Sequence, residues 1–174
     1  EWSEWSNTDS AQALTITEPA VTVSKSWPLM NTNSEREITY QLRIEHLPWT
    51  TADAYDLTVT DVVPSQLIVL SWAQISWPIP DSVVYGQTFT ASYGQFATGD
   101  IAIFEITAKL DPAIVFNTSV NNTASTQWTN ADGTLTGERT WTWGVNDYSD
   151  SDAAGTYFSF AIDIDKQVDA TSIA

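Results

Sequence analysis

The chain has 174 residues, of which 43% are hydrophobic and 12% aromatic, so it can bury the core of one domain and is not wholly disordered. Its 22 acidic residues against 6 basic ones give a net charge of −16. This balance argues against nucleic acid or an anionic membrane as a partner, because both need patches of lysine and arginine. There is no cysteine, which excludes disulfides and thiolate metal sites.

No apolar run reaches the length that spans a bilayer, and no signal peptide opens the chain. We therefore expect no membrane insertion within this segment. The start at Glu1-Trp2-Ser3 has the character of a chain interior, and we expect a fragment or processed product of a larger protein.

Stretches that alternate apolar and polar residues follow one another along the chain and predict β-strands. In the first of them, Val21, Val23 and Lys25 share one face. The later stretches with this pattern are 38–44, 57–63, 101–110 and 120–128. A tight turn is expected at Asn130-Ala131-Asp132-Gly133, and no stretch shows sustained helical spacing. The pattern predicts an all-β fold, an immunoglobulin-like β-sandwich of two sheets.

The two ends of the chain resemble each other, which is the mark of an internal repeat. The stretch from Asp9 to Lys25 matches the stretch from Asp150 to Lys166 at a constant offset of 141 positions (150 − 9 = 141). A chance match between short acidic segments is the alternative. On the repeat interpretation the chain is one repeat of a tandem array, with 33 residues (174 − 141 = 33) that overlap the next unit.

The repeat sets the expected domain boundaries. Residues 1–13 would be the junction from a preceding repeat, 14–145 the sandwich, and 146–174 the junction and first strand of the following repeat. Lys166 would then be the counterpart of Lys25, and the region around Ile162 and Ile164 would be an extended strand outside the first domain's core.

Three polar residues are aligned with the apolar faces of their predicted strands, namely Lys25, Asp61 and Asn122. A buried lysine loses its proton readily and becomes a nucleophile. A carboxylic acid in an apolar site stays protonated and can shuttle protons, and an asparagine amide is an electrophile that can lose ammonia. Together they could form a Lys–Asn isopeptide bond between two strands, with Asp61 as the catalytic acid in a single turnover.

The spacing alone leaves another interpretation open. Lys25 could extend its amine to solvent, Asp61 could cap the turn before Pro64, and Asn122 could bond to backbone. Asn121 is the alternative electrophile, but alternation points it outward. Glu105 is the alternative acid, but its neighbours Phe104 and Ile106 claim the buried face of that strand.

Several stretches resemble, in order, the motifs of bacterial and archaeal surface repeats called "domain of unknown function eleven". They are also similar to the isopeptide-forming domains of fimbrial proteins and collagen-type adhesins. The resemblance covers about residues 14 to 166, and its most specific element is the T-D-x-x-P run that holds Asp61. The stretches that carry it are Ile38-Thr39-Tyr40, 57–67, 99–110, Val120-Asn121-Asn122-Thr123-Ala124 and the tail 137–151.

In cross-linking members of that family, a lysine lies on the first strand, an acid lies centrally and an asparagine precedes a small residue on a late strand. Lys25, Asp61 and Asn122 occupy those positions here. The resemblance therefore implies a structural repeat of an extracellular fibre, stalk or adhesin, with neighbouring repeats as partners. A filament built by strand donation from residues 156–167 is an alternative.

Weaker signals concern metal and sugar. Oxygen atoms of Asn146, Asp147, Asp150 and Asp152 could bind calcium at the junction, although a solvated acidic linker has the same composition. No other cofactor is expected. Asn117 and Asn121 open sequons for N-glycosylation.

Nine tryptophans are many for this length. We expect Trp27, Trp72 and Trp128 to pack in the core or at strand edges. Trp49, Trp77, Trp141 and Trp143 follow the strand pattern less closely; we expect packing for them too, and a carbohydrate-binding platform is the alternative. The lone His46 has no nucleophile motif near it, and no hydrolase or phosphate-loop signature occurs, so we expect no enzyme that acts on an external substrate.

Overall fold

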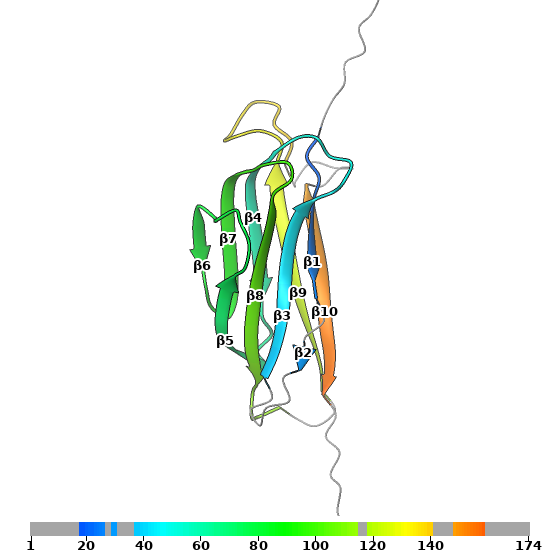
Figure 1. The fold of residues 1–174 in the computed structure, drawn as a ribbon, viewed down its shortest axis with the longest axis vertical. Coiled ribbons are helices and arrows are strands. Elements are labelled where there is room, and N and C mark those ends of the chain that lie inside the picture. Colours follow the sequence, from blue (N-terminus) through cyan, green and yellow to red (C-terminus); the bar gives the residue numbers. More distant parts are fainter. Residues whose placement is uncertain (1–17, 27–28, 31–36, 115–117, 141–147, 159–174) are drawn as a thin grey trace, which may run out of the picture.

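A computed structural model describes residues 18–26, 29–30, 37–114, 118–140 and 148–158 (Figure 1). Within these residues every regular element is a strand, and the strands form two antiparallel sheets that face each other. The all-β, immunoglobulin-like sandwich that the alternating pattern predicts is confirmed. The described residues contain no helix long and apolar enough to cross a membrane.

The first sheet has the strand order β1-β3-β8-β5, and a short strand β2 also pairs with β3. Its strands are β1 (Val21–Lys25), β2 (Leu29–Met30), β3 (Glu37–His46), β5 (Leu67–Gln74) and β8 (Ile101–Leu110). The second sheet has the order β10-β9-β4-β7-β6. Its strands are β4 (Ala54–Val62), β6 (Ser82–Val84), β7 (Thr88–Phe96), β9 (Thr118–Thr129) and β10 (Ser149–Phe158).

The core lies between the sheets and is filled by alternate residues of each strand, because successive side chains of a strand point to opposite faces. On β3 and β8 the alternation is regular over ten residues each. Phe89 of β7 is fully buried, with its ring centroid 4.2 Å from that of Trp72 and 4.8 Å from that of Phe104. Trp128 is 4% exposed. Trp72 and Trp128 thus pack as expected, while Trp27 lies outside the described residues.

The chain enters and leaves the sandwich at opposite ends. Strand β1 begins opposite His46, the last residue of β3, and β10 ends opposite Thr118, the first residue of β9. In Figure 1, β1 starts near the top of the sandwich and β10 finishes near the bottom. A pull on the two ends is therefore directed along the long axis of the domain.

Strand β10 extends the sandwich beyond residue 145, the end that the sequence analysis expects. It pairs with β9 from Ser149↔Gln127 to Phe158↔Thr118. The alternating signal is weak here, because the residues of β10 that face the sandwich include Asp150 and Asp152 beside Ala154 rather than large apolar side chains. Residues 1–13 and 159–174, with Ile162, Ile164 and Lys166, lie outside the described residues, so the tandem repeat stays a prediction.

Candidate cross-linking site

Lys25, Asp61 and Asn122 meet in the interior of the sandwich. Lys25 is the last residue of β1, in the first sheet, and Asp61 and Asn122 lie on the adjacent strands β4 and β9 of the second. Asp61 pairs with Ala124, so Asn122 is one step further along the same inward face of β9. The three residues are 7%, 0% and 4% exposed. The structure thus brings together the trio that alternation placed on apolar faces.

The lysine amine and the aspartate carboxyl are in direct contact. Lys25 Nζ donates a hydrogen bond to Asp61 Oδ2, and neither side chain has any exposed surface. The amine also lies 4.7 Å from the centroid of the Tyr40 ring, within the range of a cation–π contact.

Burial changes the ionisation of both groups. It lowers the pKa of Lys25, an effect that the charge of Asp61 opposes. Burial likewise raises the pKa of Asp61, and the charge of Lys25 opposes that shift. Since desolvation disfavours the charged form of each group, both pKa shifts are in the direction of a neutral amine and a neutral carboxyl. These are the protonation states that a nucleophilic amine and a proton donor require.

Asn122 is held by a residue that the sequence analysis did not assign to the site. Its Nδ2 donates a hydrogen bond of 2.6 Å to the hydroxyl of Tyr40, a buried residue of β3. Burial raises the pKa of Tyr40, so the phenol remains neutral. The only signal in the sequence was a tyrosine hydroxyl on an inward face, where it needs a hydrogen-bond partner.

Two buried oxygens at the site, Asp61 Oδ1 and Asn122 Oδ1, have no hydrogen-bond partner among the described residues. An unsatisfied buried polar atom costs about 1–3 kcal/mol, so native proteins rarely keep two of them together without a reason. A cavity of about 10 Å³ lies next to Asn122, and its lining also includes Lys25, Tyr40 and Ala154. It has about the size needed to hold one small molecule such as water.

The raised pKa of Asp61 predicts a pH-dependent stability once its cation is removed. In Lys25→Met, burial acts on Asp61 without an opposing charge. The pKa of Asp61 in the folded chain lies above its ordinary value of 3.8. The contribution of Asp61 to the free energy of unfolding is therefore fully present below pH 3.8 and is lost as pH rises through the folded pKa. Thermal unfolding should therefore show a larger loss of stability between about pH 4 and about pH 8 than in the control Lys25→Met/Asp61→Asn. Equal losses in the two variants would contradict the burial of a titrating Asp61.

The alternative reactive residues lie outside the site. Glu105 faces away from the core, where it accepts a hydrogen bond of 3.3 Å from Gln41 Nε2. Asn121 is exposed on the outer face of β9. Its glycosylation stays a prediction, and Asn117 lies outside the described residues. His46 is 9% exposed, and its Nε2 lies 3.0 Å from the carbonyl oxygen of Phe96, so it packs within the fold.

The calcium candidates divide into two pairs. Asn146 and Asp147 lie outside the described residues. Asp150 and Asp152 lie in β10, and each directs a carboxylate oxygen to the backbone of β1. Within the described ranges there is no group of three or more residues of the types that bind metal. The acidic pattern that suggested a calcium linker therefore contains residues with a hydrogen-bonding role in the sandwich.

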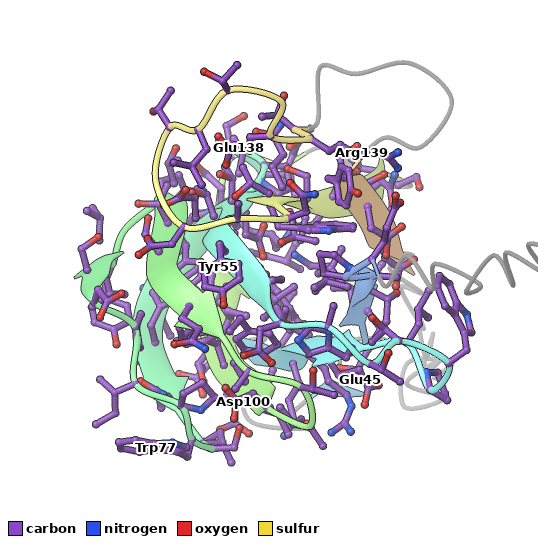
Figure 2. The ribbon with its side chains drawn as sticks, turned by 90° about the horizontal axis from the view of Figure 1, so that it is seen from above. Glu45, Tyr55, Trp77, Asp100, Glu138 and Arg139 are labelled. Atoms are coloured by element: carbon purple, nitrogen blue, oxygen red, sulfur yellow. The ribbon has the colours of Figure 1, made fainter. Side chains whose placement is uncertain are left out.

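Two of the tryptophans proposed as a sugar platform are exposed, Trp49 by 69% and Trp77 by 72%. They lie in different loops, between β3 and β4 and between β5 and β6. Figure 2 shows Trp77 at the outer rim of the sandwich, directed away from the core. Trp141 and Trp143 lie outside the described residues. Sugar binding stays a prediction.

The sequence matches no protein-family model, and no curated protein matches it. Solved structures do match the fold. A variant of the major pilin subunit BcpA of Bacillus cereus has a TM-score of 0.51 at 14% identity, over 82% of this chain and 40% of that one. The unmodified BcpA has a TM-score of 0.50 at 15% identity, over 81% and 40%. The Actinomyces fimbrial adhesin FimA has a TM-score of 0.44 at 15% identity, over 76% and 55%.

This chain thus spans about two fifths of the length of BcpA. At identities this low, the likeness concerns the arrangement of strands. The chain shares its immunoglobulin-like sandwich fold with a domain of a bacterial pilin subunit.

Proposed function

We propose that the chain is a structural unit of an extracellular surface fibre and that an isopeptide bond between Lys25 and Asn122 fastens its two sheets together. The observation that supports this most is the burial of a lysine, an aspartate and an asparagine in one contact cluster inside an apolar core. A charged pair in such a place is expensive, and an ordinary core would do better with apolar side chains. Pilin subunits share the fold, which is consistent with a fibre.

The chemistry is an amide exchange that needs no outside reagent. The neutral amine of Lys25 attacks Cγ of Asn122, a new Nζ–Cγ bond forms, and the Cγ–Nδ2 bond breaks. The amine loses a proton and the departing nitrogen gains one, so one ammonia leaves. Asp61, in contact with the amine, serves as the proton shuttle between the two nitrogens.

The surroundings of the trio suit this reaction. Tyr40 fixes the asparagine amide through its hydroxyl, and the adjoining cavity has room for a departing ammonia. Because the trio is buried, bulk water cannot solvate the neutral amine of Lys25 or hydrolyse the side-chain amide of Asn122 in competition with the cross-link. The reaction is a single turnover of the chain on itself, because the cross-linked chain is its product.

The position of the bond suits a load-bearing role. It would join β1 of the first sheet to β9 of the second, so the sheets could not separate while it is intact. Since the chain enters at one end of the sandwich and leaves at the other, tandem units would be strung along the direction of pull. We propose neighbouring repeats, in the same chain or by strand donation, as the partners, and a cell-surface or secreted location.

The intact mass of the purified chain and two variants tests the proposal. The wild-type chain and Asn121→Ala should each be lighter than their sequence by one ammonia, because Asn121 faces outward. Asn122→Ala should have its full sequence mass. A mass deficit that survives in Asn122→Ala, or that disappears in Asn121→Ala, would show that the bond involves a residue other than Asn122. A wild-type chain of full sequence mass would show that no bond forms.

A further inference from the structure

We propose that Asp152, assisted by Asp150, is a positioning residue that holds the lysine strand in its reactive place, so that cross-linking waits until strand β10 has docked. This inference rests on the proposed Lys25–Asn122 bond. It adds the C-terminal strand of the sandwich to the machinery of bond formation.

Strand β1 has two edges with different partners. Along one edge it pairs with β3, from Val21↔His46 to Lys25↔Leu42. Along the other edge, two of its backbone amides donate hydrogen bonds to side-chain carboxylates rather than to the carbonyls of another strand. The amide of Val23 donates to Asp150 Oδ2 at 2.9 Å, and the amide of Lys25 donates to Asp152 Oδ2 at 2.7 Å. The two aspartates of β10 therefore take the place of a strand partner on this edge.

Each carboxylate is itself held in position. Asp150 Oδ2 also accepts a hydrogen bond of 2.7 Å from the hydroxyl of Thr22. Asp152 Oδ1 accepts one of 2.8 Å from the amide of Ala153. Hydrogen bonds to an ionised acceptor are stronger than neutral ones, so this contact can fix the end of a short strand.

The contact made by Asp152 is placed where it affects the reaction most. It is made to the backbone of Lys25, the residue that supplies the nucleophile. Fixing that backbone sets the direction in which the side chain enters the core, and small misplacements of a reacting group cost large factors in rate. Asp152 acts through Lys25 rather than on the reacting atoms, which is why it is a positioning residue.

Strand β10 also completes the asparagine side of the site. Ala154 pairs with Asn122 across the β9–β10 ladder, and it lines the cavity beside the trio. One strand therefore supports both residues that would be joined. A bond that depends on β10 would form only after this strand has paired with β9 and reached β1.

The test follows the rate of ammonia loss in the full chain. The chain is synthesised without cells, collected in denaturant before it folds, and diluted into native buffer, and its intact mass is measured over time. Asp152→Ala should lose ammonia about tenfold more slowly than the wild type, the factor expected when a hydrogen bond to a charged acceptor is lost. Asp152→Asn should recover most of the rate, since its amide oxygen can accept from the same N–H.

Ser151→Ala is the matched control, because Ser151 lies between the two aspartates and is exposed. It should react at the wild-type rate. A wild-type rate in Asp152→Ala, or no recovery in Asp152→Asn, would overturn the positioning role. Circular dichroism of each variant after dilution separates slow cross-linking from failure to fold.

A second measurement keeps this inference separate from the cross-link. Hydrogen exchange of the Val23 and Lys25 amides reports the carboxylate contacts whether or not a bond forms. If the wild type never loses ammonia, the cross-link is absent. The contact between Asp152 of β10 and the backbone of β1 is then still supported if Asp152→Ala speeds hydrogen exchange of the Lys25 amide about tenfold. It is overturned if the exchange rate of that amide is unchanged.

Discussion

Replacing Asp61 by alanine is expected to leave the ammonia on Asn122 and to lower the stability of the domain by more than 5 kcal/mol, a rough sum of two terms. The first is the buried Lys25, whose side chain has no exposed surface and would remain in the core as an unreacted amine without its contact to Asp61. Removing one member of a buried pair costs about 3–5 kcal/mol. The second is the missing cross-link, which closes a loop of about 100 residues and is worth about 4–5 kcal/mol by the chain-entropy estimate for such loops.

Thermal unfolding measures this effect. With roughly 2–4 °C per kcal/mol for a domain of this size, the midpoint should fall by at least about 10 °C. Glu105→Ala removes the alternative acid, which faces away from the core and is the matched control. It should keep the ammonia deficit and change stability by no more than about 0.5 kcal/mol. An Asp61→Ala variant that is as stable as the wild type and equally light would show that Asp61 takes no part.

The second large effect is expected under mechanical load. Force applied to the two ends enters at β1 and leaves at β10, so it reaches the bond before it reaches the strands between the joined residues. The bond would shield the stretch from Lys25 to Asn122, which is 97 residues along the chain (122 − 25 = 97). At about 3.3–3.6 Å per extended residue, roughly 320–350 Å of chain could not be pulled out.

Single-molecule pulling checks this directly. Unfolding of Asn122→Ala should release roughly 320–350 Å more contour length than unfolding of the wild type. Asn121→Ala leaves the buried amide intact and should behave as the wild type does. Equal extensions for the wild type and Asn122→Ala would mean that no covalent bond bridges the sheets.

Some of this site could be predicted from the sequence because alternation fixes the face of a strand. Lys25, Asp61 and Asn122 each stood in line with apolar neighbours, and all three are buried. That the three residues meet could not be predicted from alternation alone. It depends on β4 lying beside β9 and on the Lys25 side chain of β1 contacting Asp61 of the other sheet, and such contacts between distant segments are not encoded in local periodicity.

Strand β10 shows where the same reasoning fails. Aspartate, serine, alanine and glycine are typical of solvated linkers, so the sequence predicts a junction here rather than a strand of the sandwich, with Asp150 and Asp152 as calcium candidates; calcium binding stays a prediction. In the structure their carboxylates accept hydrogen bonds from the amides of β1. A strand whose inward residues bond to another strand's backbone has little apolar signal. Tyr40 was recognisable as an inward residue of its strand, but its bond to Asn122 depends on the packing of the two sheets.

The most direct test of the cross-link is peptide mapping of the wild-type chain after trypsin digestion. The chain has six sites for trypsin, at Lys25, Arg36, Arg43, Lys109, Arg139 and Lys166. A lysine in an isopeptide bond has no free amine for the protease to recognise, so the account predicts that residues 1–36 remain uncut and are joined to residues 110–139. That joined product should weigh one ammonia less than the sum of its parts, and its fragmentation should place the link at Lys25 and Asn122. Recovery of 1–25, 26–36 and 110–139 as separate peptides of full mass would contradict the account.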